Sequence, residues 1–390
     1  MYRIGKEEAE EVTKVLASKN MFKINDVNRE CERFEEELRE KFSVSHSIFV
    51  TSGFGALTSA LTAIGAGPGD EIIIPAYTYI ATAMAVVACG AIPVICDIDE
   101  TYTIDVKKAE EKITERTKAI IPVHLQGFPC NMDAVLALAA KHNLLVVEDA
   151  CQADGGSYKG RRLGTIGIAG AMSFNHFKII SAGEGGALLT NDDKIFARSL
   201  IYQDACAIAF FGNQLDGIDE PQFCGSEFRA NEVSAAILRM QLRRLDGILS
   251  DLRKNKAKLT AILSKDYKIG KSNDIEGDCG TILPLVFDDE ESAREFAAAF
   301  ENEAFLPIDT GKHIYNNWTA IMEKRGAFNP LMDPFKHPKN IDYVPDYKNE
   351  VYPVTLSLLA KSVFIPINPD WTDEDIENIV DGFRKRAANK

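Results

Sequence analysis

Several features are missing from this sequence of 390 residues, and each absence excludes a class of protein. No apolar run approaches the roughly 20 residues of a membrane helix. Residues 1–8 contain no apolar export signal, so we expect a cytoplasmic protein that does not contact a membrane. The eight cysteines are scattered without a C-x-x-C pair, which fits neither a zinc site nor a disulfide scaffold. We therefore expect no metal and interpret the cysteines as buried free thiols.

Basic residues are also scarce relative to acidic ones. The chain has 44 lysines and arginines against 58 aspartates and glutamates, a formal charge of -14. Nucleic-acid binding relies on clustered lysine and arginine, so this balance argues against a general nucleic-acid partner. It does not exclude an anionic substrate, because a local pocket can oppose the overall sign.

The chain does contain a repeated alternation of strand and helix signals. Apolar strand patterns at 71–75, 92–96, 119–123 and 144–147 are separated by helical patterns. Such repetition is typical of an α/β fold with a mostly parallel sheet covered by helices on both faces. With an apolar share of 46%, the length suits one large domain and a smaller one.

The pattern changes in the last third of the chain. A long helical spacing over 228–266 could connect two domains, and we expect a large domain at 1–245 and a smaller α+β domain at 246–390. The elements expected beyond the long helix are strands at 282–287, 305–309 and 363–367 and helices at 292–303 and 372–386.

Candidate functional residues recur where predicted strands end. Gly53 follows a short strand at 48–50, Tyr79 follows the next strand, and Asp149 follows a later one. Ligands of α/β proteins gather at the carboxyl ends of the strands, so these residues are expected to share a pocket. The small residues at 52–56 precede a helix whose free N–H groups suit a phosphate, although a βα turn without a ligand has the same pattern.

The stretch 144–190 contains the groups that pyridoxal phosphate (PLP) requires. PLP needs a lysine for its Schiff base, an acid at its pyridine nitrogen, a phosphate cradle and a surface for its ring. Lys178, Asp149 and Ser173 are candidates for the first three, and Gly183–Gly186 form a permissive turn nearby. Each has an ordinary alternative: a surface lysine, a helix cap or buried ion pair, and a strand-end serine.

The motifs of this stretch resemble those of the DegT/DnrJ/EryC1/StrS family of PLP-dependent sugar aminotransferases. The resemblance covers most of the chain and implies a fold-type-I enzyme with a mostly parallel seven-stranded sheet. The motifs that carry it are Glu148-Asp149-Ala150-Cys151-Gln152, Ser173-Phe174-x-x-x-Lys178, Gly183-Glu184-Gly185-Gly186, Pro75-Ala76-Tyr77-Thr78-Tyr79, Pro122-Val123-His124 and Tyr158-Lys159-Gly160.

The resemblance also implies roles for individual residues. Lys178 is the implied Schiff-base lysine and proton shuttle, and Asp149 is the implied partner of the pyridinium nitrogen. The other implied cofactor contacts are Gln152 beside the phenolic oxygen, Tyr79 stacked on the ring, Cys151 near its opposite face, and Ser173 with the backbone of Gly53 and Phe54 at the phosphate.

The implied reaction moves an amino group from glutamate or glutamine, through the PLP and PMP forms of the cofactor, to a keto or aldehydo sugar. The acceptor could be a nucleotide sugar, a cyclitol or a keto-sugar acid, and the family implies a homodimer with shared active sites. One alternative is a sugar dehydratase, whose family subset has histidine at the lysine position; here Lys178 occupies it and His176 lies nearby. The other is a non-catalytic regulator that binds PLP or a sugar, usually fused to a DNA-binding segment that neither end offers.

Two positions depart from the family pattern, and one further segment extends the resemblance. Phe54 stands where the family commonly has threonine, which leaves Ser52 and Ser173 as candidates to compensate at the phosphate. Glu227 stands where the family usually has an asparagine that reaches the neighbouring subunit's phosphate, so we assign it no such role. Residues 312–318 resemble the segment of aminotransferases acting on inososes or eight-carbon keto-sugar acids. His313 and Tyr315 are the candidate substrate contacts there, and a structural loop packed on Trp318 explains the segment equally well.

Overall fold

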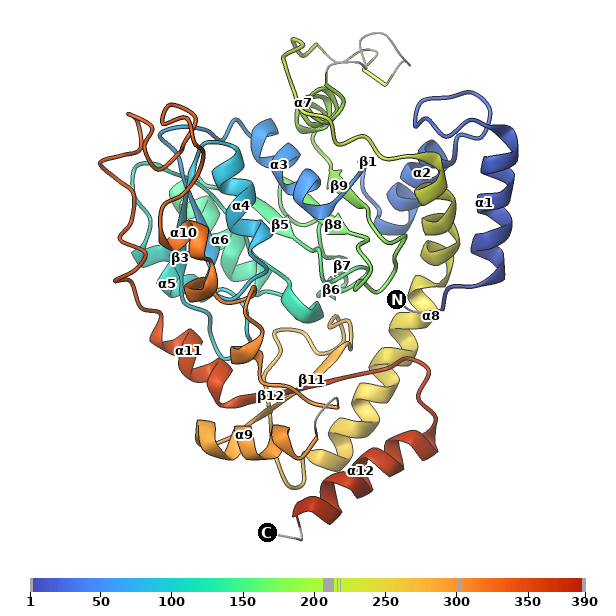
Figure 1. Cartoon of the computed structure of the whole chain (residues 1–390), viewed down its shortest axis with the longest axis vertical. Coiled ribbons are helices and arrows are strands. Elements are labelled where there is room, and N and C mark those ends of the chain that lie inside the picture. The colour runs from blue at the N-terminus through green and yellow to red at the C-terminus, as the bar shows by residue number, and fades with distance from the viewer. Residues whose placement is uncertain (1–2, 206–213, 216, 218, 301–302, 388–390) are drawn as a thin grey trace.

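A seven-stranded sheet forms the centre of the larger part of the molecule (Figure 1). Its order is β1-β9-β8-β5-β4-β2-β3, and only β9 runs antiparallel to its neighbours. This confirms the predicted mostly parallel sheet. The strands are β1 (His46–Val50), β2 (Glu71–Pro75), β3 (Ile92–Cys96), β4 (Thr117–Ile120), β5 (Leu145–Asp149), β8 (Ala169–Ser173) and β9 (Gly186–Thr190). This computed structural model describes residues 3–205, 214, 215, 217, 219–300 and 303–387.

Helices cover both faces of the sheet because successive strand residues point to opposite sides. In β2, Ile73 belongs to the core under α2 and α6, whereas Ile72 and Ile74 belong to the core under α3 and α4. The helices of this part are α1 (Lys6–Ser18), α2 (Glu30–Phe42), α3 (Gly53–Ala63), α4 (Ala81–Ala88), α5 (Val106–Glu111), α6 (Met132–His142) and α7 (Asp193–Gln203), with a hairpin of β6 (Ser157–Tyr158) and β7 (Arg161–Arg162).

The long helix α8 (Glu232–Leu263) connects this part to a smaller three-stranded sheet (Figure 1). It packs against α1 and α2 and also against α12 and β11. The expected division at 245/246 falls inside this continuous helix. The smaller part contains β10 (Lys268–Ile269), β11 (Ile282–Val286), α9 (Glu290–Ala298), β12 (Ser362–Pro366) and α12 (Asp373–Ala387).

The strand predicted at 305–309 is wrong. Only Phe305 pairs, through an isolated bridge to Phe364, and Pro307–Asp309 form a short 3-10 helix. Pro307 has no N–H to give to a strand ladder, so the chain turns after one paired residue.

The irregular stretch after this turn returns to the large sheet. Its short elements are η4 (Tyr315–Asn317), α10 (Thr319–Met322) and α11 (Pro353–Ala360). Ile314 bridges to Tyr77, and the Tyr347 hydroxyl donates to the Pro93 carbonyl at 2.7 Å. Residues that follow α8 in sequence therefore pack against the edge of the large sheet.

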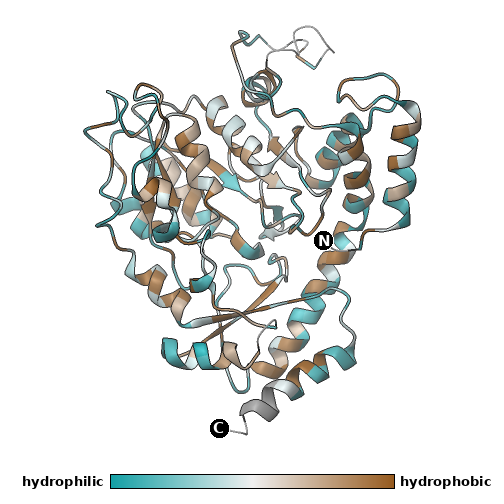
Figure 2. Ribbon diagram, in the orientation of Figure 1, coloured by the Kyte–Doolittle hydropathy of each residue, from teal (hydrophilic) through white to brown (hydrophobic). Residues whose placement is uncertain are grey.

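Most of the described cysteines fit the expectation of buried thiols. Cys31, Cys96, Cys130 and Cys279 are buried, but Cys224 is exposed, which differs from that expectation. Cys206 lies outside the described residues. Apolar residues otherwise gather along the strands and the helix sides that face them (Figure 2). No helix of the described residues is long and apolar enough to cross a membrane.

Candidate active site

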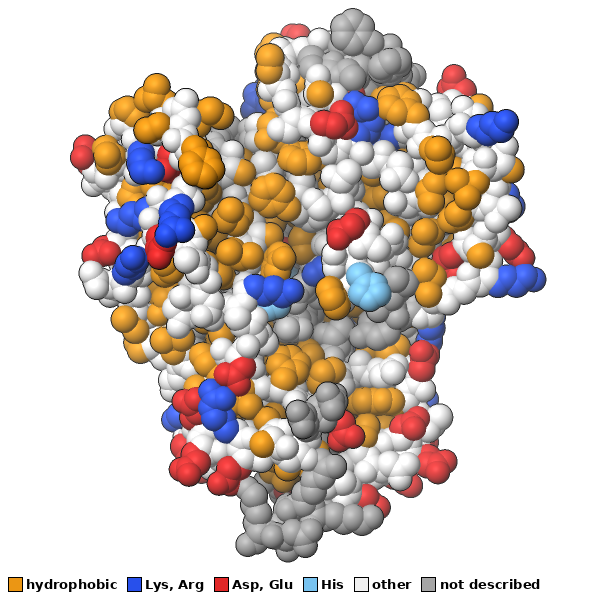
Figure 3. Space-filling model, in the orientation of Figure 1, with side chains coloured by type: hydrophobic (Ala, Val, Ile, Leu, Met, Phe, Trp, Pro, Cys, Tyr) orange, Lys and Arg blue, Asp and Glu red, His pale blue; other side chains and the backbone are white. Residues whose placement is uncertain are grey.

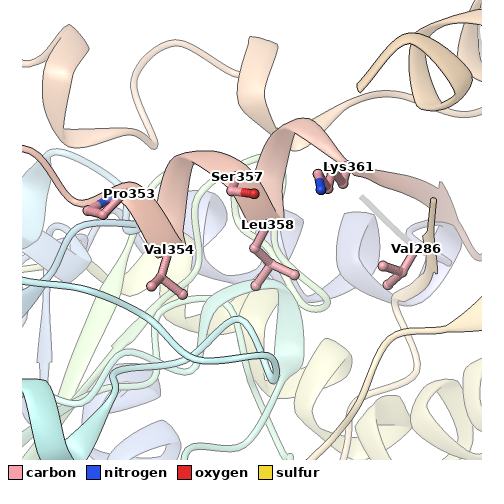
Figure 4. A pocket seen from close by; sticks show the side chains of 6 residues that line it. All are labelled: Val286, Pro353, Val354, Ser357, Leu358 and Lys361. Carbon is pink, nitrogen blue, oxygen red and sulfur yellow. The ribbon is translucent and has the colours of Figure 1, made fainter. Parts of the chain in front are cut away.

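A cavity of about 610 Å³ lies where β5 and β8 end, as expected for the carboxyl ends of parallel strands. Basic and histidine side chains lie near the centre of the face shown in Figure 3. The residues to which the sequence analysis gave a role, and which line this cavity, are Ser52, Gly53, Phe54, Tyr79, Asp149, Cys151, Gln152, Ser173, Lys178 and His313. A second cavity, of about 410 Å³, lies between α11 and β11 (Figure 4); its walls are mostly apolar, with Lys361 at one end.

Asp149 is held rigidly at the end of β5. It is 5% exposed, and its Oδ2 accepts a hydrogen bond from the Thr82 hydroxyl at 2.7 Å while Oδ1 accepts the Cys151 N–H at 3.1 Å. The Thr82 hydroxyl donates its one proton to Asp149. Its oxygen can therefore only accept from the Thr78 hydroxyl, which lies 2.7 Å away. This chain fixes the direction in which the carboxylate faces the cavity.

Glu148, the preceding residue, points to the opposite face of the sheet because side chains alternate along a strand. Its carboxylate is fully buried and accepts the backbone N–H groups of Gly164 at 2.9 Å, Ile166 at 2.5 Å and Gly167 at 2.7 Å. His124 Nε2 lies 3.1 Å from it. Since His124 Nδ1 accepts the Cys130 N–H, the proton of this imidazole is on Nε2 and is donated to Glu148.

The N-terminus of α3 forms a cradle for an anion. The N–H groups of Gly53 and Phe54 have no hydrogen-bond partner within the described residues, as is usual in the first turn of a helix. A Cβ on Gly53 would lie 2.6 Å from Cys151 Sγ and 2.9 Å from Ser173 Cβ, so only glycine permits this close approach. The Ser52 hydroxyl accepts the Gly55 N–H at 3.0 Å, which leaves its own proton available to an anion.

Lys178 reaches the cavity from a turn that follows β8. Its N–H donates to the Asn175 carbonyl at 2.9 Å, and the His176 N–H donates to Gly183, whose φ is 88°. Gly183 thus closes the turn in a conformation that favours glycine. The Lys178 Nζ has no hydrogen-bond or ion-pair partner in the part of the chain that the structure describes. A lysine without an acidic partner at a cavity wall is available to react with a ligand.

Gln152 and His313 meet across the cavity. The Gln152 amide nitrogen lies 3.3 Å from His313 Nε2, and its Oε1 accepts the Gln126 N–H at 3.2 Å. Burial, reinforced by the positive charges of Lys312 and Lys178, lowers the pKa of His313 to about 4. The imidazole is therefore neutral at physiological pH, and its Nε2 accepts the Gln152 amide proton.

We predict that His313 titrates near pH 4 in the protein free of cofactor. The pKa of His313 in the folded protein lies below the unfolded value near 6.5. Its neutral ring therefore contributes to the free energy of unfolding above about pH 6.5, and this contribution is lost as pH falls to about 4. The measurement is the pH dependence of the histidine Cε1–H NMR signals, assigned with His313→Gln. A His313 signal that titrates near pH 6.5 would refute the prediction.

The structure places other predicted residues away from the cavity. Tyr315 is 3% exposed, its hydroxyl accepts the Tyr352 N–H at 3.2 Å, and it is not among the lining residues. Trp318 is fully buried and donates to the Lys312 carbonyl, so the loop packs on Trp318 and also brings His313 to the cavity. Glu227 pairs with Arg229 at 2.6 Å, and His176 is exposed. We therefore keep His313 alone as the candidate substrate contact.

Three residues near the cavity had no role in the sequence analysis. Thr82, in the first turn of α4, orients Asp149 and accepts the hydroxyl of Thr78 from the loop before that helix, and no local pattern marked it. Lys312 lines the cavity beside His313. Asp154 is 1% exposed with both carboxylate oxygens unpaired among the described residues, and burial raises its pKa well above the ordinary value against the charge of Lys178. No local pattern marked Asp154, whereas Lys312 begins the segment 312–318 that the resemblance singled out without giving this residue a role.

These residues fit PLP. Asp149 offers a buried, oriented carboxylate, Lys178 an unpaired amine, and the first turn of α3 with Ser173 an anion cradle that a Cβ on Gly53 would obstruct. The fold and this cavity together define a PLP-dependent aminotransferase of fold type I.

Comparison with known proteins identifies the family. Residues 2–384 match the DegT/DnrJ/EryC1/StrS aminotransferase family, and the chain belongs to it. The spore coat polysaccharide biosynthesis protein SpsC of Bacillus subtilis is 32% identical over 98% of this chain and 94% of its own. GDP-perosamine synthase of Caulobacter vibrioides is 42% identical over 57% of this chain and 59% of its own length. The X-ray structure of an aminotransferase from Psychrobacter cryohalolentis superimposes with a TM-score of 0.79 and 28% identity, covering 100% of this chain and 98% of that one.

Proposed function

We propose that the protein transfers an amino group from glutamate or glutamine to a keto or aldehydo sugar in the biosynthesis of an amino sugar. The observation that carries this proposal is the meeting of Asp149, Lys178 and the α3 cradle in one cavity. The names of two relatives, a perosamine synthase and a polysaccharide biosynthesis protein, support a sugar as the acceptor. The acceptor is a nucleotide sugar, a cyclitol or a keto-sugar acid.

Each side chain at the cavity has a separate role toward the cofactor. When bound, PLP would supply an aldehyde carbon that carries the amino group between donor and acceptor and a ring that accepts electron density. Asp149 holds a proton at the pyridine nitrogen. The hydrogen bonds from the Thr82 hydroxyl and the Cys151 N–H fix the orientation of its carboxylate. Lys178 holds the cofactor and then moves a proton between the substrate Cα and the cofactor C4′.

The remaining contacts orient the cofactor. Ser173, Ser52 and the N–H groups of Gly53 and Phe54 bind its phosphate, so serine hydroxyls supply the contact that a threonine in place of Phe54 would make. Gln152, steadied by His313, donates beside the phenolic oxygen. Tyr79 and Cys151 line the same cavity, and they would contact the two faces of the ring as the family resemblance implies.

Half-reaction spectroscopy tests the function. The purified protein is loaded with PLP, and glutamate or glutamine is added without an acceptor; the visible absorption band should disappear as the amino group is taken up. A panel of keto sugars is then added, and the correct class should restore the band with formation of an aminated sugar. A protein that binds no PLP, or a band that neither donor changes, would refute the proposal.

We also propose a cytoplasmic homodimer whose active sites are shared between subunits, as membership of this family led us to expect. Arg229 pairs with Glu227 and also with the buried Asp204, so these three side chains keep a net negative charge and we assign Glu227 no contact to a phosphate. Light scattering of the loaded protein should give twice the chain mass of 43.0 kDa. A mass of one chain would refute the dimer.

A further inference from the structure

Lys312 lies on a loop whose backbone is fixed to the large sheet. The Lys312 carbonyl accepts the Ile80 N–H at 3.0 Å and the Trp318 indole N–H at 3.1 Å. The next carbonyl, that of His313, accepts the Thr78 N–H at 2.9 Å. Three hydrogen bonds therefore fix the point from which the Lys312 side chain extends.

The Lys312 ammonium lies at the mouth of the active-site cavity between two aromatic rings. Its Nζ is 5.4 Å from the centroid of the Tyr79 ring and 5.8 Å from that of Phe177. Both distances are within the range of a cation–π contact, which positions an ammonium without neutralising its charge. Phe177 is 80% exposed and Tyr79 40% exposed, so the mouth of the cavity is open at this point.

No acid neutralises Lys312 in the described residues, and the acids that line the cavity are engaged elsewhere. Asp149 is buried with both oxygens bonded to Thr82 and Cys151. Glu184 accepts the Asn175 side-chain amide at 2.9 Å. The cavity thus keeps an uncompensated positive charge at its mouth although the whole chain carries -14.

We propose that Lys312 binds an anionic group, a carboxylate or a phosphate, on the substrate of this site. The inference rests on the proposed function, in which PLP accounts for Lys178 and Asp149. Its phosphate is assigned to the α3 cradle with Ser52 and Ser173 and its phenolic oxygen to Gln152, so the anion for Lys312 is expected on the substrate. Two substrates supply such an anion: the amino donor carries carboxylates, and a keto-sugar acid or nucleotide sugar as acceptor carries a carboxylate or phosphates. The lowered pKa of His313, caused by burial and then by Lys312 and Lys178, is consistent with both ammonium groups acting on this wall.

The electrostatic argument gives the expected size. A charge-assisted hydrogen bond is about twice as strong as a neutral one, and a partly desolvated cavity mouth screens it less than open solvent does. We expect Lys312→Gln to weaken the apparent affinity for one substrate about 10- to 100-fold while the limiting rate changes less than about threefold. Lys312→Arg should restore most of the affinity because it keeps the charge.

The two half-reactions separate the two sources of the anion. In stopped-flow absorbance on the PLP-loaded enzyme, an affinity loss only in the donor half-reaction supports Lys312 binding to a donor carboxylate. A loss only in the acceptor half-reaction supports binding to an anion on the sugar. Unchanged affinity in both halves, or a loss confined to the limiting rate, would overturn the inference, and a wild type that fails both halves refutes the proposed function instead.

Calorimetry provides a readout that is independent of turnover. Glutarate, gluconate and pyrophosphate are non-reacting probes for a donor carboxylate, a sugar-acid carboxylate and a nucleotide diphosphate. At least one should bind the loaded wild type about 10-fold more tightly than it binds Lys312→Gln. Lys361→Gln is the matched control, since Lys361 lies at the separate cavity of Figure 4 and should leave every affinity unchanged. Equal binding of all three probes to wild type and Lys312→Gln would overturn the inference.

Discussion

Replacing Lys178 with alanine should lower the rate of amino transfer by at least about 10⁴-fold, because in the proposed mechanism this one residue supplies both the amine that holds PLP and the proton shuttle. The visible absorption band of the loaded protein should disappear as well, since alanine cannot form a covalent bond to the cofactor. Absorbance spectra and single-turnover rates with glutamate measure the two effects.

The matched variant is Lys178→Arg, which keeps a positive charge and a similar length. Arginine stays protonated at neutral pH and cannot attack a carbonyl, so it should lose the band as completely as alanine does. Unfolding midpoints of both variants without cofactor should stay close to that of the wild type, because the Lys178 Nζ has no partner among the described residues. A visible band that survives in either variant would show that another lysine holds PLP.

Replacing Glu148 with alanine should destabilise the protein by about 3–5 kcal/mol, because each buried donor left without an acceptor costs about 1–3 kcal/mol and partial rearrangement recovers some of the sum. The change leaves the N–H groups of Gly164, Ile166 and Gly167 and the His124 imidazole without an acceptor in a site that water does not reach. Urea unfolding of the protein without cofactor measures the difference.

Glu148→Gln sharpens the test because it keeps the shape of the side chain. The glutamine NH₂ group would face the backbone N–H donors that one carboxylate oxygen of Glu148 accepts. The single amide oxygen cannot replace both carboxylate oxygens, so the loss of stability should be substantial. Glu115→Gln is the control: Glu115 is 90% exposed and 3.9 Å from Arg116, and its change should stay within about 0.5 kcal/mol. A loss below about 1 kcal/mol in Glu148→Ala would contradict the structural role assigned to this carboxylate.

The contrast between Glu148 and Asp149 shows how strand geometry separates neighbouring residues. Both are acids in the same strand and the same sequence motif. Because the side-chain period of a strand is two, one carboxylate faces a ring of backbone donors and the other faces the cofactor cavity. The motif marked both residues, but only the sheet assigns them different surroundings.

The sequence by itself determined the regular part of this protein. Strand and helix periods are local, so they predicted the strands at 71–75 and 92–96 with the bounds the structure shows. The spacing of the motifs predicted that Asp149, Ser173 and Lys178 share one pocket, because parallel strands present their carboxyl ends at one edge of a sheet. The same local reasoning failed at 305–309, where Pro307 turns a chain whose apolar pattern resembled a strand.

Only the tertiary structure decided which distant residues complete the site. Thr82, Asp154 and Lys312 reach the cavity region through packing between segments far apart in the chain, and no local period encodes such contacts. The loop that carries His313 was expected in the smaller domain, yet hydrogen bonds to Thr78 and Ile80 fix it against the large sheet. The meeting of Asp149, Ser173 and Lys178 in one cavity could therefore be predicted from the sequence, whereas the position of Lys312 at its mouth depends on how the chain folds back onto the large sheet.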